Sequence, residues 1–150
     1  MPSTAGSIEM HALEVQWSSG LCDCFNDPIN CVATCFFPCI TMGENAEIIS
    51  KGETSCIAAT TIYFLLCSIG CQGGYGYHYR TKLRKLLGLP KETCKDNLVH
   101  GCCCFCALCQ EYRELKLHGA DSTIGWKANV ENWRSQGVTV PPFFDPQMTR

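Results

Sequence analysis

The sequence predicts a mainly α-helical protein, namely a small cysteine-rich membrane protein with a helical hairpin (one or two transmembrane helices) and an irregular C-terminal tail. Two observations carry this prediction. Charged residues make up only 17% of the 150, against about a quarter in soluble domains, and cysteine occurs 14 times. Two segments, 28–43 and 54–79, also contain no Asp, Glu, Lys or Arg, and the second is long enough to cross a bilayer.

Charge and motifs exclude some classes of function. The net charge is −2, whereas a nucleic-acid-binding domain needs a basic surface, so no nucleic-acid partner is expected. No segment resembles a nucleophile elbow, a phosphate-binding loop or a metal-hydrolase helix, so we predict no enzyme and no catalytic residue. Residues 1–20 have neither the basic start nor the apolar stretch of a secretory signal. The cysteines are therefore expected to be reduced, which favours metal binding over disulfides.

Three regions are predicted along the chain. Residues 1–16 mix serine, glycine and charge and are expected to form a mobile N-terminal tail. A cysteine-rich membrane domain is predicted for 17–126, followed by a C-terminal tail at 127–150. Trp17 begins the domain and is interpreted either as an anchor at the membrane interface or as an aromatic residue that packs on its own domain.

Pro38 divides the first apolar segment. Proline donates no backbone hydrogen bond and biases the residue before it away from helical dihedral angles. We therefore expect a turn or half-helix through Phe37 and a new helix that begins at Pro38 and runs towards Ser50.

Thiols and carboxylates surround this break. Cys31, Cys35 and Cys39 are four residues apart, so on a helix they would share one face, although the break at Pro38 is expected to reorient Cys39. Glu44 and Glu47 share a face of the next helix. Cadmium and zinc favour thiolates, and zinc also accepts carboxylate. Because a transported ion must be released, we predict that Cys39, Glu44 and Glu47 form the weaker site that takes part in transport.

Residues 54–79 are predicted to form a transmembrane helix, and a buried helix of a soluble protein is the alternative. Basic residues follow at 80–85, which would place this end in the cytoplasm, and the leucines at 83, 86 and 87 would form an amphipathic turn on the membrane face. One side of the predicted helix is expected to face other helices, either through close packing or as the wall of an ion pathway. This stripe consists of Cys56, Thr60, Tyr63, Cys67, Cys71 and Gly74.

A second group of thiols lies at 94–110, a segment that we expect to be re-entrant or interfacial and to lead into a helix over 107–118. The predicted ligands that capture the metal are Cys102, Cys103, Cys104, Cys106 and Cys109. Two alternatives stay open. The first is a structural zinc at Cys94, His100, Cys102 and Cys106, and the second is palmitoylation of cysteines next to the membrane.

Three runs of residues resemble one plant family. They are W-x-x-x-L-C-x-C-F from residue 17, P-C-I-T-x-G-x-x-A-E-I from residue 38, and the highly specific C-A-L-C-Q-E-Y-R-E-L-K at 106–116. Over 17–126 the sequence resembles the plant cadmium resistance and cell number regulator family, which has a cysteine-rich placenta-specific-8-like domain. The family's hallmark is two adjacent cysteines, four residues, then Cys-Pro-Cys. Val32 and Phe37 replace two of these cysteines here, and Cys35 is an additional thiol.

The resemblance implies a self-associating plasma-membrane protein. Members of the family lower cellular cadmium or move zinc, so a divalent zinc or cadmium ion is expected as the bound or transported ion, with no certain cofactor. The alternative that the resemblance implies is a membrane-bound negative regulator of cell proliferation and organ size. A soluble thiol-rich metal buffer fits the composition but not an inserted 54–76 segment.

Overall fold

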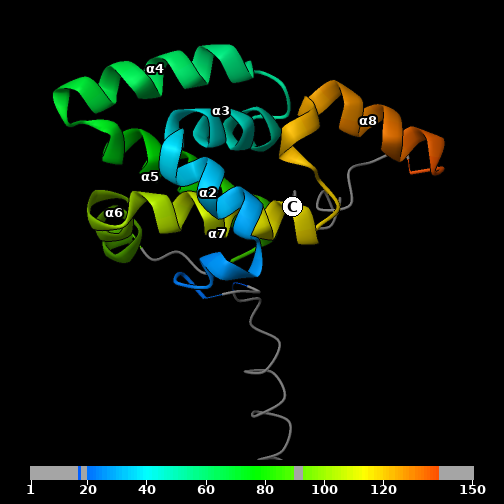
Figure 1. The fold of residues 1–150 in the computed structure, drawn as a ribbon. Coiled ribbons are helices and arrows are strands. Elements are labelled where there is room, and N and C mark those ends of the chain that lie inside the picture. Colours follow the sequence, from blue (N-terminus) through cyan, green and yellow to red (C-terminus); the bar gives the residue numbers. More distant parts are fainter. Residues whose placement is uncertain (1–16, 18–19, 90–92, 139–150) are drawn as a thin grey trace, which may run out of the picture.

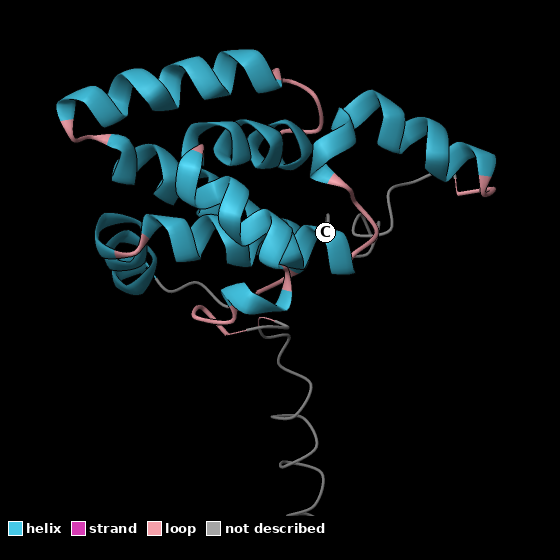
Figure 2. Ribbon diagram, viewed as in Figure 1, coloured by secondary structure: helices cyan, strands magenta, loops and turns pink. Residues whose placement is uncertain are grey.

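The computed structural model describes residues 17, 20–89 and 93–138. This part of the chain folds into seven α-helices and two short 3-10 helices and contains no strand (Figure 2). The mainly helical prediction is therefore confirmed. In chain order the elements are η1 (Cys24–Asn26), α2 (Pro28–Phe36), α3 (Pro38–Ile49), α4 (Cys56–Ile69), α5 (Gln72–Leu87), α6 (Thr93–Cys102), α7 (Cys104–Leu117), η2 (Ser122–Ile124) and α8 (Gly125–Ser135).

Proline begins both of the first two α-helices, and the predicted break is confirmed. Helix α2 ends at Phe36, Phe37 leaves helical geometry with φ −134° and ψ 66°, and α3 begins at Pro38. A proline at the first helical position loses nothing, because its missing N–H would have no partner inside the helix. The side chain of Asp27 caps α2 by accepting a hydrogen bond from the Asn30 N–H at 3.1 Å.

Helix α3 is the central element of the bundle. It contacts α2, α4, α5, α7 and α8, and Figure 1 shows α4 running alongside it. The two helices approach closely at Gly43, where a Cβ atom would collide with the Thr60 side chain and lie 2.6 Å from the Cys56 carbonyl oxygen. The first half of the predicted stripe, with Cys56, Thr60 and the buried Tyr63, thus packs closely inside the bundle. The other end of the stripe, with Cys67 and Cys71, is exposed.

The predicted transmembrane helix is wrong, because residues 54–79 form parts of two helices. Helix α4 has only 14 residues and ends at Ile69, because Gly70 after it adopts the left-handed conformation with φ 77°. Glycine stops helices in this way because it has no Cβ to oppose a positive φ. After Cys71 the chain continues as the separate helix α5. Among the described helices, none combines the length and apolar character needed to cross a bilayer.

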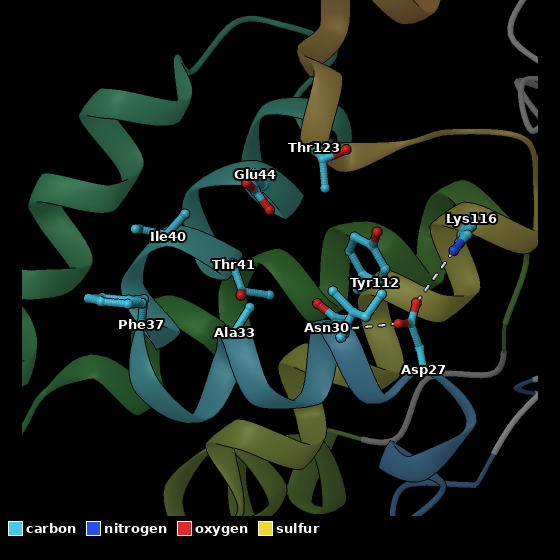
Figure 3. Close-up of a pocket in the computed structure, with 11 residues that line it drawn as sticks. Asp27, Asn30, Ala33, Phe37, Ile40, Thr41, Glu44, Tyr112, Lys116 and Thr123 are labelled. Atoms are coloured by element: carbon cyan, nitrogen blue, oxygen red, sulfur yellow. Dashed lines mark hydrogen bonds and ion pairs between the residues drawn. The ribbon is translucent and has the colours of Figure 1, made fainter.

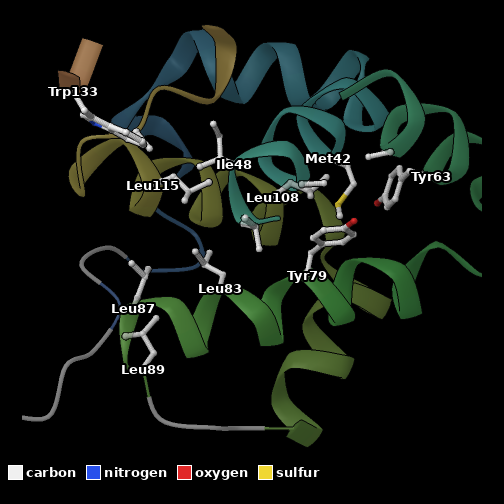
Figure 4. Close-up of a cluster of buried hydrophobic side chains, with 14 residues drawn as sticks. Met42, Ile48, Tyr63, Tyr79, Leu83, Leu87, Leu89, Leu108, Leu115 and Trp133 are labelled. Carbon is white, nitrogen blue, oxygen red and sulfur yellow. The ribbon is translucent and has the colours of Figure 1, made fainter. Parts of the chain in front are cut away.

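The leucines that were expected on the membrane face pack inside the protein instead. Leu83 and Leu87 of α5 are buried, and Figure 4 shows them in the same apolar cluster as Met42 and Ile48 of α3 and Leu108 of α7. The apolar side of α5 therefore faces α3 and α7, and only part of Leu86 remains accessible.

Arg80 and Arg84 are also buried, although they belong to the basic cluster that was predicted to lie in the cytoplasm. Arg80 donates to Asp96 of α6 at 2.9 Å, and Arg84 donates to the same carboxylate at 2.7 Å. Arg80 also donates to Gln110 of α7 at 2.7 Å. The ring of Trp17 lies 4.2 Å from the Arg80 guanidinium carbon, so Trp17 packs on its own domain and covers this cluster.

The predicted irregular C-terminal tail is partly wrong, because Gly125–Ser135 forms α8. Trp126 and Trp133 of this helix meet edge to face with ring centroids 5.6 Å apart, and Trp133 is buried against the core. Residues 139–150 of the predicted tail and 1–16 of the N-terminal tail lie outside the described residues.

Candidate functional site

The three thiols around Pro38 do not form one face. Cys35 is exposed and Cys31 half-buried on α2, whereas Cys39 lies beyond the turn at Phe37, on α3, and packs against the core. Cys39 was the thiol expected to be reoriented by Pro38, and it lies on the next helix. The proline break therefore separates Cys39 from the other two thiols.

Cys39 has other thiol neighbours, which come from helices distant in sequence. Burial raises the pKa of the Cys67 thiol on α4, and the charges of Cys39 and Cys104 raise it further. These thiols lie in the first turn of α3, the last turn of α4 and the first turn of α7. Cys67 was absent from the predicted ligands, although the helical stripe at 56–74 contained it.

The five predicted capture thiols lie around a second break in the chain. Cys102 ends α6, Cys103 stands between the helices and Cys104 begins α7. Cys102 and Cys103 are exposed, whereas Cys109 is buried in α7. The helix predicted to begin at residue 107 therefore starts three residues earlier.

No predicted metal site is assembled within the described part of one chain. There, no group of three or more His, Cys, Asp or Glu side chains is placed to hold a metal ion, and no cysteine forms a disulfide. The alternative zinc site would need His100, whose Nε2 instead lies 2.8 Å from Glu111 Oε1 in the interior. The side chain of Cys94 lies outside the described residues.

Glu47 has a structural role that the sequence did not reveal. Its Oε2 accepts a hydrogen bond from the Cys56 N–H at 3.0 Å, and its Oε1 accepts one from the Trp126 N–H at 2.8 Å. Both donors lie in the first turn of a helix, where N–H groups lack partners inside the helix and attract negative charge. One carboxylate therefore holds the starts of α4 and α8.

Glu44, in contrast, faces a pocket of about 310 Å³ (Figure 3). Burial raises the pKa of its carboxyl group, and the nearby charge of Asp121 raises it further. No hydrogen bond or ion pair joins the Glu44 side chain to another described residue. The pocket lies between α2, α3 and α7 and is lined by Asp27, Ile29, Asn30, Ala33, Phe37, Ile40, Thr41, Glu44, Tyr112, Lys116 and Thr123.

The pocket is negative and contains no thiol. Asp27 Oδ2 is 3.4 Å from the Lys116 ammonium, which lies at the surface. Burial raises the pKa of Tyr112, and the charges of Asp121, Asp27 and Glu44 raise it further. Such a lining attracts a cation but supplies oxygen donors alone, so it suits a hard ion better than cadmium.

The outer sides of α2 and of α4 each expose large apolar side chains, which also escaped the sequence analysis. Ile29 is 83% exposed, Phe36 74%, Ile57 80% and Ile69 71%. Exposed apolar groups of this extent are unusual for a monomer in water. We call these two helix sides the apolar surface; its members are Ile29, Val32 and Phe36 of α2 and Ile57, Phe64, Leu65 and Ile69 of α4.

Comparison with known proteins decides the family. Residues 17–114 match the PLAC8 family. The chain belongs to the PLAC8 family. Its curated relatives include Protein PLANT CADMIUM RESISTANCE 12 of Arabidopsis thaliana, with 46% identity over 89% of this chain and 83% of the relative. They also include Cell number regulator 9 of Zea mays, with 44% identity over 99% of this chain and 85% of the relative.

A third relative, Cell number regulator 10 of Zea mays, is 50% identical over 86% of this chain and 83% of its own length. Both branches of the predicted resemblance are thus represented, and the resemblance is confirmed. No solved structure matches the chain.

Proposed function

We propose that this PLAC8 protein is a heavy-metal resistance protein of the plasma membrane, which lowers cellular cadmium or moves zinc. The observation that carries the proposal is the accessibility of the thiols. Most described cysteines are exposed or half-buried, although cysteine usually lies in the interior. Relatives whose names include cadmium resistance support the same function.

The proposed ligands are the predicted thiols of the two breaks, with thiolate as the donor that cadmium and zinc favour. They are Cys31, Cys35, Cys39, Cys102, Cys103, Cys104, Cys106 and Cys109. A complete site needs more donors than one copy brings together, so we propose that metal binding joins thiols of two copies, which requires self-association. Glu44 is the proposed weak carboxylate donor along the ion's route. Glu47 is a poorer candidate, because both of its oxygens already accept hydrogen bonds.

The proposed contact with the lipid bilayer is interfacial and uses the apolar surface of α2 and α4. Helices with one apolar side bind at the boundary between headgroups and acyl chains in proportion to the apolar area that they bury. The exposed Phe and Ile side chains would insert there. This arrangement needs no helix long enough to span the membrane.

The second candidate function is a membrane-bound negative regulator of cell proliferation and organ size. Relatives named cell number regulator, at 44% and 50% identity, favour it. In that case the thiols would bind metal weakly or not at all.

Cadmium titration of the purified reduced protein tests the thiol assignment. We expect the thiolate-to-cadmium absorption band to saturate at one or more ions per dimer. A variant with Cys35, Cys102 and Cys103 replaced by serine should lose at least half of the bound cadmium. The matched control is Cys22→Ser, another exposed cysteine outside the predicted set. Equal cadmium binding by the triple variant and the control would contradict the assignment and favour the regulator.

Flotation with lipid vesicles tests the membrane contact separately. The double change Phe36→Ser and Phe64→Ser removes two exposed aromatic rings of the apolar surface and should reduce binding to the vesicles by at least tenfold. Ile124→Ser, on η2 outside that surface, is the control and should bind as the parent does. Unchanged flotation of the double variant would contradict the interfacial contact.

A further inference from the structure

A second hollow lies between the α3–α4 turn and α5, and none of the predicted metal ligands lines it. Its volume is about 260 Å³, and it opens to solvent. Lys51 comes from the turn, and Lys82 and Lys85 come from α5, where their spacing of three places them on one face. Ile49, Ser50, Glu53 and Leu86 complete the lining.

This hollow concentrates positive charge in a chain whose net charge is −2. Lys82 and Lys85 form no ion pair with any described residue. The Lys82 ammonium lies 5.5 Å from the centre of the Tyr79 ring. Glu53 is the single acidic residue of the lining, against three lysines. Their like charges favour an anion in the hollow over a cation.

The backbone at Lys51 provides an independent observation. Lys51 is the only non-glycine residue of the described chain with a positive φ, at 58°, and Gly52 follows it with φ 79°. A side chain in this left-handed region costs about 1 kcal/mol relative to glycine. Glycine would therefore make the turn at lower cost, and the lysine adds a charge that the turn itself does not need.

We propose that the three-lysine hollow binds a phosphomonoester group. Lysine ammonium groups bind phosphate as point charges and donate hydrogen bonds to its oxygens. The hollow can hold a phosphate together with part of the molecule that carries it, and the Ile49 and Leu86 side chains offer that part an apolar contact. The phosphate can belong to a lipid headgroup or to a soluble compound. The site contains no thiol and is independent of the proposed metal binding.

Calorimetric titration of the full-length protein with inositol 1,4,5-trisphosphate and with inorganic phosphate tests the site. We expect micromolar binding of the trisphosphate that weakens at least tenfold in the double variant Lys82→Gln and Lys85→Gln. The matched control is Lys127→Gln, an exposed lysine of α8 outside the hollow, which should bind as the parent does. No binding of either probe by the parent, or equal weakening by the control, would overturn the proposal.

Two further measurements identify the source and guard against misfolding. Vesicles containing phosphatidylinositol 4,5-bisphosphate should be bound more tightly than the soluble trisphosphate if the source is a lipid, and inorganic phosphate should match the trisphosphate if it is a free phosphate. Lys51→Gly relieves the backbone strain, so we expect this variant to unfold at higher temperature and yet to bind phosphate more weakly. If it binds as tightly as the parent, Lys51 is not part of a phosphate site. Cadmium binding should be unchanged in every variant, which separates this proposal from the metal function.

Discussion

At the scale of single residues, Glu44 and Glu47 show how two carboxylates of one helix acquire opposite roles. The sequence predicted that they share a face and act together on an ion. In the structure, Glu47 holds the starts of α4 and α8, whereas Glu44 faces a negative pocket. The sequence predicts the helix and the face that the two carboxylates share. It does not predict that the N–H groups of residues 56 and 126 donate to Glu47, because these contacts depend on how distant helices pack.

Glu47→Gln is expected to lower the free energy of unfolding by about 1.5–3 kcal/mol, the range for hydrogen bonds to charged groups. The reason is that glutamine has one acceptor oxygen where two N–H groups need one each. Urea unfolding followed by circular dichroism measures the loss.

Glu44→Gln is the matched control on the same helix, and it is not expected to destabilise the protein. A carboxyl group whose pKa is raised in the folded state contributes stability below its unfolded pKa and loses it as the pH rises through the folded pKa. Removing the charge at pH 7 should therefore leave the protein equally or slightly more stable. If Glu44→Gln destabilises as much as Glu47→Gln, the structural role assigned to Glu47 is not specific.

At the scale of elements, some breaks between helices are determined by neighbouring residues, whereas the packing of the helices depends on residues distant in the sequence. The break at Pro38 was predictable because proline acts on its own backbone and on its neighbour. The break at Gly70 was missed because glycine permits a left-handed turn without requiring one, and the apolar run around it favoured a single long helix. The close contact between Gly43 and Thr60 allows α3 to pack against α4. A single sequence does not reveal which residues of the two helices are in contact.

Gly43→Ala is therefore expected to destabilise the protein by about 1–3 kcal/mol, typical of overpacking, because the new methyl group meets the Cys56 carbonyl oxygen and the Thr60 side chain. Gly74→Ala makes the same change on α5, where a Cβ meets nothing within 4 Å. That control should stabilise by about 0.5–1 kcal/mol, since alanine is the better helix former. Thermal unfolding of both variants measures the contrast, and similar shifts in one direction would refute the close α3–α4 contact.

At the scale of the whole molecule, a buried charged cluster joins three helices and the N-terminal Trp17. Arg80 and Arg84 meet Asp96 across α5 and α6, and Gln110 and Glu111 of α7 complete the cluster. The sequence predicted helices, but it placed these arginines, and the leucines that now form part of the core, at a membrane surface. Basic residues that follow an apolar segment indicate a membrane surface. The acidic partners of these arginines lie 12 to 31 residues away in the sequence, so a local pattern does not reveal them.

Asp96→Asn is expected to cost about 3–5 kcal/mol, because it leaves two buried guanidinium groups short of negative charge. The pH dependence gives a second readout. Burial alone would raise the pKa of Asp96, but hydrogen bonds from Arg84 and Arg80 outweigh it and hold the pKa below its ordinary value of 3.8. This stability is present above the unfolded pKa and is lost as the pH falls through the folded pKa.

Urea unfolding between pH 2 and pH 7 should therefore show a steep loss of stability at the acid end in the parent and a shallower one in Asp96→Asn. Glu131→Gln, an exposed carboxylate of α8, is the control and should keep the parent's slope. Parallel curves for parent and Asp96→Asn would show that the cluster is not charged as described.

The position of Glu47 also bears on how the chain divides into modules. The match to the PLAC8 family ends at residue 114, yet α8 beyond it is fastened to a carboxylate that lies inside the matched region. The Glu47 carboxylate, inside the matched region, thus binds the start of a helix outside it, and the same carboxylate also binds the start of α4. Exchanging or deleting the segment after residue 124 would therefore alter the α3–α4 hairpin near the other end of the sequence, so the C-terminal helix is not an interchangeable addition.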